Sequence, residues 1–200
     1  MGIGPTKNEV RSARTREKVL GAAIECIYEL GLQNTSTIDI TKRAGISRGA
    51  MLHHYPSKED LLSAAYEALL EMEANKLKRA AEDYRNGGLT VDEFIDQLWA
   101  RFSVESFSIT MDYFAAARTD KSLRGKVQKA RRNYDAALND IWTNYFSDSS
   151  ADQRELLAHL QLTVSLFRGM SMQRLVLDDQ NAQDELIAIW KRHVRSALSP

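Results

Sequence analysis

Hydrophobic residues recur at helical spacing along most of the chain, and no stretch shows the strict alternation of a half-buried strand. The first such stretch runs from about Arg14 to Leu30, and its apolar positions follow i, i+3, i+4, i+7 and i+8, which places them on one helical face. Gly31 follows directly and can end this helix. The preceding residues, 1–13, show glycine, proline and no periodicity, so they are expected to form a flexible arm. The buried face is predicted to consist of Val19, Ala22, Ala23, Cys26, Ile27 and Leu30.

Two short helices joined by a glycine turn are predicted in the stretch that follows. Ser36 can cap the first helix, and Asp39 three residues later completes a capping box. Ile38 is expected to face the interior. Gly45 can take the left-handed conformation that ends this helix, and Ser47 can cap the second one. A helix, a glycine turn and a second helix in this order are typical of the helix-turn-helix motif of DNA-binding proteins.

The second short helix begins at Arg48, and its first turn continues with Gly49 and Ala50. Small side chains at the start of a helix let it enter the major groove, and a cationic one can reach a base edge or a phosphate. Pro56 stops this helix, because the residue before a proline disfavours helical geometry. Lys58 then falls in the first turn of a longer helix, where free backbone amides favour a phosphate. The stretch is therefore a candidate DNA-binding surface.

The rest of the chain predicts a larger helical bundle. A long helix over 58–84 ends before Gly87, and Thr90 with Glu93 forms a capping box for the next helix. Further periodic stretches predict helices around 107–115, from Leu123 onward, over 150–177 and over 181–198.

Aromatic residues gather in the middle of the chain. Ordinary core packing is one interpretation, because large aromatic side chains are common in protein cores. A ligand pocket between helices is the other, since such pockets are lined mainly by apolar and aromatic groups with a few polar ones. The candidate polar anchors are Arg101, Asp112, Arg118 and His159. The candidate pocket residues are Trp99, Phe102, Met111, Phe114, Tyr134, Trp142 and Phe167.

The last two helices carry apolar residues on more than one face. Such a helix pair has additional surface to bury, which suggests that it joins its counterpart across a two-fold axis as a four-helix dimer interface. The alternative is that the apolar stripes are internal core. The candidate interface residues are Leu160, Val164, Phe167, Gly169, Ile187, Trp190 and Val194.

Composition indicates a globular protein whose positive charge is local. The 200 residues include 27 Lys or Arg and 27 Asp or Glu, so the whole chain has no net charge. Residues 1–48 hold eight Lys or Arg against five acids, a net of +3, which fits a DNA-facing surface but equally a solvated basic face. No apolar run approaches the ~20 residues that span a bilayer, and no signal peptide is recognisable. We therefore expect a cytoplasmic protein without a membrane partner.

The sequence contains no motif for metal, redox or catalytic chemistry. Cys26 is the only cysteine, which excludes an internal disulfide and a cysteine metal cage and fits a reducing compartment. His53 and His54 are adjacent, hence about 100° apart around a helix, so they cannot readily share one metal as an i, i+4 pair does. The chain has no glycine-rich phosphate loop, Gly-x-Ser-x-Gly turn or His-Glu-x-x-His helix. We expect no cofactor and no enzymatic activity.

The chain resembles the tetracycline-repressor (TetR) family of bacterial transcription regulators in two segments, IDITKRAG and GISRGAMLHHYPSKEDLL. IDITKRAG resembles the helix that precedes the family's recognition helix. GISRGAMLHHYPSKEDLL resembles the recognition helix and the segment that follows it. Leu52 departs from the family, which commonly has a phosphate-binding tyrosine there, and Thr41 replaces a usual small apolar residue. The DNA-facing positions that the resemblance implies are Thr37, Ser47, Arg48, Gly49, Ala50, His53, His54 and Lys58.

The resemblance implies an all-α fold of about nine helices, with an N-terminal three-helix helix-turn-helix DNA-binding domain and a larger C-terminal helical bundle for ligand binding and dimerisation. The corresponding divisions are 14–57, a linking helix over 58–84, and 85–200. It also implies a homodimeric repressor that binds double-stranded DNA at a palindromic operator and is released by a small apolar or aromatic inducer. Two alternatives remain open: a DNA-binding regulator without small-molecule control, and an all-helical adaptor that binds only proteins.

Overall fold

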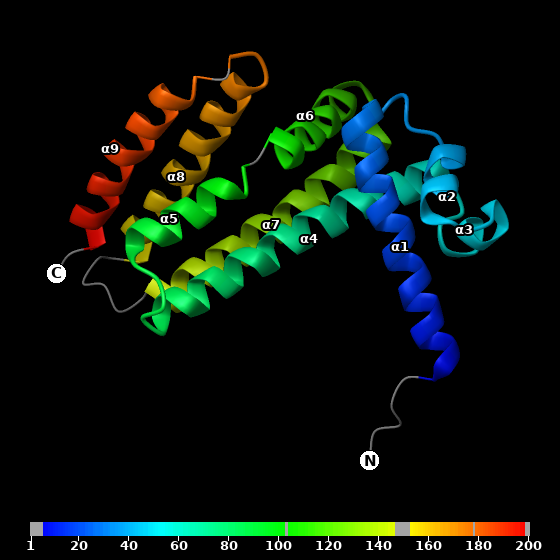
Figure 1. The fold of residues 1–200 in the computed structure, drawn as a ribbon, viewed down its shortest axis with the longest axis horizontal. Coiled ribbons are helices and arrows are strands. Elements are labelled where there is room, and N and C mark those ends of the chain that lie inside the picture. Colours follow the sequence, from blue (N-terminus) through cyan, green and yellow to red (C-terminus); the bar gives the residue numbers. More distant parts are fainter. Residues whose placement is uncertain (1–5, 103, 147–152, 178, 199–200) are drawn as a thin grey trace. The chain divides into compact units, whose positions relative to one another are not determined.

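The computed structural model describes residues 6–102, 104–146, 153–177 and 179–198. Over these residues the chain is all-α and contains no strand, which confirms the predicted fold class (Figure 1). None of the helices described there is both long and apolar enough to cross a membrane. Residues 1–5 of the predicted arm and 150–152 of a predicted helix lie outside the described residues. The helices are α1 (Lys7–Leu30), α2 (Thr37–Ala44), α3 (Arg48–His54), α4 (Lys58–Arg85), α5 (Val91–Ala100), α6 (Val104–Thr119), α7 (Lys121–Phe146), α8 (Gln153–Arg174) and α9 (Gln180–Leu198).

The chain forms two compact units, and each takes in two separate stretches of sequence. Unit 1 comprises Met1–Leu69 and Ile109–Ala130, and unit 2 comprises Leu70–Ser108 and Arg131–Pro200. The divisions expected from the sequence follow chain order, whereas the compact units do not, because 109–130 packs with the N-terminal helices. Helices α4, α6 and α7 each contribute residues to both units.

Helix α1 begins at Lys7, well before the predicted start at about Arg14. The Thr6 hydroxyl accepts a hydrogen bond from the Glu9 amide at 3.3 Å, and the Glu9 carboxylate accepts one from the Thr6 amide at 2.7 Å. This capping box satisfies amides that a helix start leaves free. The sequence analysis missed the box and therefore assigned 7–13 to a flexible arm.

The core of unit 1 includes the contact of α1 with α2 and α3. Cys26 of α1 is buried there, and burial raises the pKa of its thiol above the ordinary value. Arg43 of α2 adds a polar contact at the edge, because its Nη1 donates to Glu29 Oε1 of α1 at 2.7 Å and lies 3.6 Å from Glu25 Oε2. The first helix therefore supports the short α2, which could not bury a core alone.

Aromatic rings fill the interior of unit 2. The rings of Trp99 and Phe102 both meet that of Phe167, with centres 5.2 and 5.7 Å apart. Phe94 meets Trp142 at 6.0 Å. These pairs join α5 and the residues after it to α7 and α8, and tilted or edge-on contacts of this kind stabilise more than area burial alone.

Helix α5 is fixed by its own cap and by α9. The predicted capping box is present, since the Thr90 hydroxyl accepts from the Glu93 amide at 3.3 Å and the Glu93 carboxylate bonds back to the Thr90 amide. Lys191 Nζ of α9 lies 2.6 Å from Asp96 Oδ2 of α5. The last helix is thereby tied to the bundle of unit 2.

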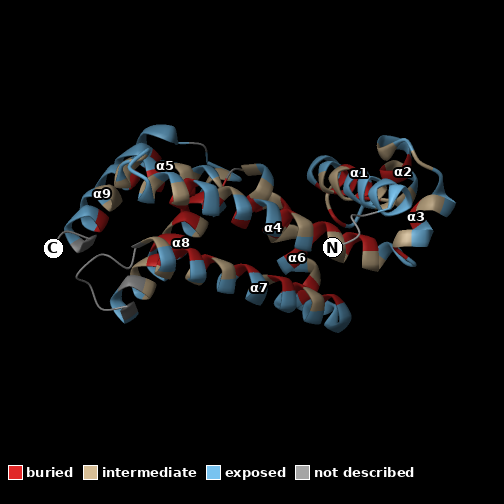
Figure 2. Ribbon diagram, turned by 90° about the horizontal axis from the view of Figure 1, so that it is seen from below, coloured by how far each residue is buried: buried red, intermediate tan, exposed pale blue. Residues whose placement is uncertain are grey.

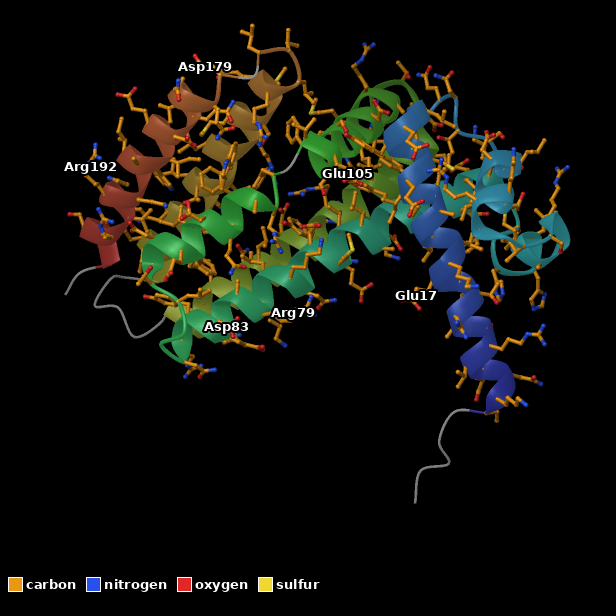
Figure 3. The ribbon with its side chains drawn as sticks, viewed as in Figure 1. Glu17, Arg79, Asp83, Glu105, Asp179 and Arg192 are labelled. Carbon is orange, nitrogen blue, oxygen red and sulfur yellow. The ribbon has the colours of Figure 1, made fainter. Side chains whose placement is uncertain are left out.

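Buried and exposed residues fall on opposite sides of each long helix (Figure 2). Most charged side chains lie on the exposed sides, and those labelled in Figure 3 extend from the ribbon into solvent. Glu73 of α4 is buried and lies 2.9 Å from Lys76 Nζ and 3.7 Å from Arg101 Nε. This is the amphipathic pattern from which the helices were predicted.

Candidate DNA-binding site

The turn between α2 and α3 depends on Gly45. Its φ of 65° and ψ of 38° lie in the left-handed region, where a side chain would clash with its own backbone. The amide of Ile46 then donates to the Thr41 carbonyl at 3.1 Å, which closes the end of α2. Ser36 caps the start of α2 together with Asp39, as the sequence predicts. Local contacts therefore fix both ends of α2, the first helix of the helix-turn-helix motif: the capping box at its start and the Gly45 turn at its end.

The inner face of α2 differs from the prediction. Ile38 is 69% exposed, whereas Ile40 is completely buried. Residues two positions apart are about 200° apart around a helix, so these two side chains cannot both face α1. The prediction for Ile38 was wrong for this reason. Thr41 is buried beside Ile40, and its hydroxyl donates to the Thr37 carbonyl at 2.8 Å.

Helix α3 presents its N-terminal end to solvent. Ser47 caps it by accepting a hydrogen bond from the Ala50 amide at 3.2 Å. Arg48 and Gly49 are exposed and Ala50 is half-buried, while Met51 in the next position is fully buried. The buried Met51 holds the helix to the unit, and the exposed first turn remains available for a groove.

The two histidines at the end of α3 differ in their surroundings. His53 is exposed and His54 is half-buried, with ring centres 5.2 Å apart. Desolvation lowers the pKa of His54, and the positive charges of His53 and Arg16 lower it further. His54 is therefore suited to donate one neutral hydrogen bond rather than to carry a full charge. Tyr55 behind them is buried, and burial raises the pKa of its hydroxyl.

Lys58 is exposed in the first turn of α4, but the two residues after it are acidic. Lys126 of α7 lies 2.8 Å from Glu59 Oε1 and 3.0 Å from Asp60 Oδ1. The Lys126 hydrogen bond is the main cause that lowers the pKa of Glu59, and the Ser57 hydroxyl, followed by Lys126, lowers that of Asp60. Lys126 thus compensates the acidic pair next to Lys58. The sequence gives no local signal for this contact, because Lys126 is 66 residues away from Asp60.

A second contact joins the α6 part of unit 1 to the residues that lead into α2. Asp112 Oδ2 accepts a hydrogen bond from the Leu32 amide at 2.9 Å. The neighbouring Tyr113 is fully buried, stacks on Tyr66 with ring centres 4.4 Å apart, and donates its hydroxyl proton to the Leu62 carbonyl. Asp112 was considered as an anchor for a ligand, and the structure places its carboxylate on backbone instead.

The candidate pocket residues do not form one cluster. Trp99, Phe102 and Phe167 meet in unit 2, whereas Met111 and Phe114 belong to unit 1. Tyr134 is buried beneath the Arg131 guanidinium at 4.9 Å, and burial raises its pKa to about 12. Trp142 is buried against Phe94. Within unit 2 the named aromatic side chains therefore take part in core packing.

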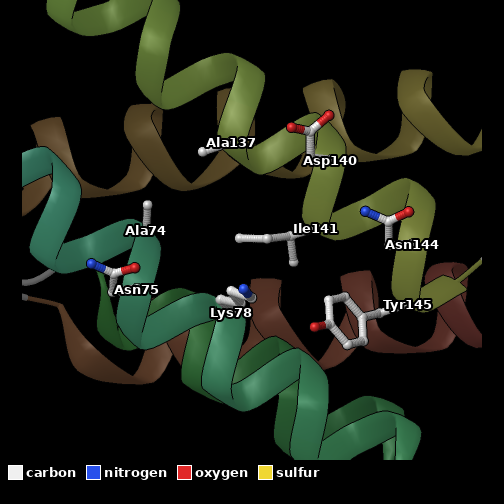
Figure 4. A pocket seen from close by; sticks show the side chains of 8 residues that line it. All are labelled: Ala74, Asn75, Lys78, Ala137, Asp140, Ile141, Asn144 and Tyr145. Carbon is white, nitrogen blue, oxygen red and sulfur yellow. The ribbon is translucent and has the colours of Figure 1, made fainter. Parts of the chain in front are cut away.

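A groove of about 340 Å³ in unit 2 lies elsewhere, between α4 and α7 (Figure 4). Its lining is mixed: three side chains are apolar, and the polar ones include the oppositely charged Lys78 and Asp140. None of the candidate pocket residues lines it. The lining residues are Ala74, Asn75, Lys78, Ala137, Asp140, Ile141, Asn144 and Tyr145.

Most of the candidate interface residues of α8 and α9 lie inside unit 2. Trp190 is half-buried and donates to the Thr163 hydroxyl at 3.1 Å, and Gly169 is exposed. The buried ones are Leu160, Val164, Phe167, Ile187 and Val194. Side chains that are covered within one chain have little surface left for a partner. Of the candidates, Gly169 remains exposed, and the large apolar residues that are exposed on these two helices are Leu162, Met172, Leu186 and Ile189.

The N-terminal part of the sequence matches a known protein family, and relatives match most of the chain. The model of the family described as bacterial regulatory proteins, tetR family, matches residues 19–65. The HTH-type transcriptional regulator CymR of Pseudomonas putida is 26% identical over 170 residues, which are 85% of this chain and 84% of CymR.

Solved structures share the fold over nearly the whole chain. A transcriptional regulator from Rhodococcus sp. Rha1 has a TM-score of 0.69 at 17% identity, over 92% of this chain and 95% of its own. The transcriptional regulator FadR of Bacillus subtilis, solved in complex with stearoyl-CoA, has a TM-score of 0.57 at 20% identity, over 92% of this chain and 97% of its own. The helix-turn-helix geometry, the family match over residues 19–65 and the sequence relatives agree: the chain is a transcriptional regulator whose N-terminal DNA-binding domain is that of the TetR family.

Proposed function

We propose that this regulator is a homodimeric repressor that binds a palindromic operator through α3 and leaves it when a small molecule binds unit 2. The single observation that carries the DNA-binding part is the solvent-exposed first turn of α3, set between the left-handed Gly45 and the buried Met51. Helices presented in this way enter the major groove with their N-terminal residues.

Each DNA-facing residue has a role that its surroundings support. Arg48 is the exposed cation of the first turn, and an arginine there can bond a guanine edge through two nitrogens. A Cβ added to Gly49 would have only the Ser47 hydroxyl nearby, at 4.0 Å, so the small residue keeps space free for DNA rather than for protein. Ala50 serves the same purpose.

The remaining residues are proposed to hold the phosphate backbone and to set the register of α3. Lys58 contributes its charge at the start of α4, where free amides add to the attraction. The other proposed backbone contacts are Thr37, Ser47, His53 and His54. Backbone contacts position the protein without reading sequence.

The dimer is proposed to form through a second apolar stripe on α8 and α9. Leu162, Leu166 and Gly169 follow i, i+4 and i+7 on α8, so they share one side of the helix. Leu186 and Ile189 share a side of α9 and are 41% and 47% exposed. A two-fold axis would bring the same stripe of a second chain against this one and place two α3 helices about 34–36 Å apart, the distance between successive major grooves.

The dimer proposal is tested by sedimentation of the Leu162→Asp variant. A charge within the stripe should yield monomers at concentrations where the wild type is dimeric. Arg79→Asp, on an exposed part of α4, is the matched control and should remain dimeric. A dimeric Leu162→Asp variant would place the interface elsewhere.

The effector is proposed to be a small molecule with an apolar body that binds in unit 2. The groove between α4 and α7 supports this, because its volume of about 340 Å³ lies in the range of small-molecule sites and Ala74, Ala137 and Ile141 give it an apolar part. FadR of Bacillus subtilis, which shares the fold, was solved with stearoyl-CoA. Release requires that the ligand bind better to the conformation with low DNA affinity. A coupling of about 1–3 kcal/mol would weaken operator binding roughly 5- to 150-fold.

The experiment is a mobility shift with the DNA upstream of the regulator's own gene. Binding of that DNA over an unrelated duplex, followed by release on addition of one compound from a metabolite panel, would support the whole proposal. If the protein binds that DNA specifically and no compound releases it, the result would support the alternative of a regulator without small-molecule control. Absence of binding even at low salt would contradict the DNA-facing assignment.

A further inference from the structure

Two histidines from neighbouring helices face each other in unit 2. The imidazole rings of His159 on α8 and His193 on α9 have centres 5.4 Å apart and planes inclined by 34°. In the single chain His193 is exposed and His159 is half-buried, so solvent reaches both. His159 lies about one turn from Leu162 and His193 about one turn from Ile189, so the pair borders the proposed dimer stripe. They belong neither to the DNA-binding site nor to the groove between α4 and α7. We propose that this pair binds a divalent transition metal ion such as Ni²⁺, Cu²⁺ or Zn²⁺ and links α8 to α9.

The ring separation matches that of two imidazoles on one metal ion. A metal–nitrogen bond is about 2.0–2.1 Å long, and each ring centre lies about 1 Å behind its nitrogen. At a tetrahedral angle the two ring centres are then about 5 Å apart, close to the 5.4 Å between His159 and His193. The proposal requires the two side chains to turn so that one nitrogen of each ring points to the ion.

His159 already has a free nitrogen lone pair. Its Nδ1 lies 2.9 Å from the carbonyl oxygen of Glu155. Because a carbonyl only accepts hydrogen bonds, Nδ1 carries the proton of the neutral ring, and Nε2 is the unprotonated nitrogen. A backbone carbonyl behind one ring nitrogen is the arrangement that orients metal-bound histidines in proteins.

The second ring is held by Trp190. The Trp190 and His193 rings have centres 4.9 Å apart and are inclined by 31°. The indole nitrogen of Trp190 donates to the Thr163 hydroxyl at 3.1 Å, and that hydroxyl donates to the His159 carbonyl at 2.7 Å. The ring of His193 and the backbone of His159 therefore belong to the same contact between α8 and α9.

Water would complete the coordination. Within the part of the chain that the structure describes, no three His, Cys, Asp or Glu side chains come together as a ligand set. A site with two protein ligands is expected to bind a metal more weakly than the three- and four-ligand sites of zinc enzymes and zinc fingers. Imidazole suits Ni²⁺, Cu²⁺ and Zn²⁺, and Cu²⁺ should bind most tightly of the three.

The chain provides its own control for the test. It has four histidines, and the other two, His53 and His54, are neighbours on α3. Calorimetric titration of Ni²⁺ into the full chain, purified without a polyhistidine tag, should give one ion per chain. Binding should be at least about tenfold weaker in His159→Asn and in His193→Asn. Losing a residue that only hydrogen-bonds to a metal ligand already costs about 10- to 100-fold in affinity, and losing a ligand itself should cost no less. The His53→Asn/His54→Asn double variant should bind like the wild type.

Trp190 gives a second readout. An ion held by His193 lies close to this indole, so Ni²⁺ should quench part of the tryptophan fluorescence of the wild type, and His193→Asn should abolish that quenching. The proposal is overturned if the wild type binds no Ni²⁺ at millimolar concentration, if both single histidine variants bind as well as the wild type, or if only the His53→Asn/His54→Asn variant loses binding. The rings would then only stack.

Discussion

Replacing Asp112 with alanine is expected to destabilise unit 1. The Asp112 carboxylate on α6 accepts the hydrogen bond of the Leu32 amide at 2.9 Å, between residues 80 positions apart in the sequence. Leu32 lies in the connection that leads from α1 to α2, and it is only 6% exposed. Alanine removes the acceptor and leaves this amide without a protein partner.

The expected loss follows from the burial of that amide. A hydrogen bond to a charged group contributes about 1.5–3 kcal/mol, and a buried amide left unpaired costs about 1–3 kcal/mol. The Asp112 bond is only partly buried, so water can replace part of it. We expect the free energy of unfolding to fall by about 1–2 kcal/mol in Asp112→Ala. Asp112→Asn retains an oxygen acceptor in the same place and should lose less than about 1 kcal/mol.

Urea unfolding followed by circular dichroism measures both variants, at one protein concentration because dimerisation would shift the midpoint. Arg118→Ala is the control on the same helix, since the side chain is exposed and surface changes stay within about 0.5 kcal/mol. The reasoning fails if Asp112→Ala matches the control, or if Asp112→Asn loses as much stability as Asp112→Ala.

Three further predictions concern the helix-turn-helix motif and its supports. Gly45→Ala should lower the free energy of unfolding in urea by about 1–2 kcal/mol through backbone strain alone, because an added Cβ meets nothing within 4 Å. Asparagine tolerates the left-handed conformation better, so Gly45→Asn should lose less stability, and equal losses in the two variants would contradict the role of strain. Glu59 and Asp60 have lowered pKa values, so they stabilise the fold fully above the unfolded pKa of about 4 and lose that effect as the pH falls through the folded values. As the pH is lowered from about 5 to about 2, the urea midpoint should therefore fall less in Lys126→Met than in the wild type. Identical pH dependences of the midpoint in the two proteins would show that Lys126 does not stabilise the two carboxylates. Leu52→Tyr restores the tyrosine that the family commonly has and should strengthen binding to operator and unrelated DNA alike in fluorescence anisotropy; a gain for the operator only would argue against a phosphate contact.

Local signals in the sequence predicted the ends of several helices. Capping boxes need only residues three positions apart, so Ser36 with Asp39 and Thr90 with Glu93 could be read directly. The box at Thr6 was missed because glycine and proline before it suggested an arm. At Ile38 the helix itself was predicted correctly, but the side of the helix that faces the core was not.

Contacts between distant residues could not be predicted from the sequence. Nothing near Lys126 indicates that it bonds Glu59, and nothing near Asp112 indicates that it bonds the Leu32 amide. An apolar stripe shows only that a helix buries that side, and it does not tell whether its own chain or a second chain covers it. For this reason the stripe that includes Val164 and Ile187 proved to be internal to unit 2.

The measurement that tests the central claim most directly compares Arg48→Ala and Lys58→Ala in binding to the upstream operator and to its single-base variants over a range of salt. Arg48→Ala should cost about 1–3 kcal/mol and relax the preference at one base pair. Lys58→Ala should weaken every sequence alike and reduce the salt slope by about 1. If both variants bind all of these duplexes as the wild type does, α3 and the start of α4 are not the surface that reads DNA.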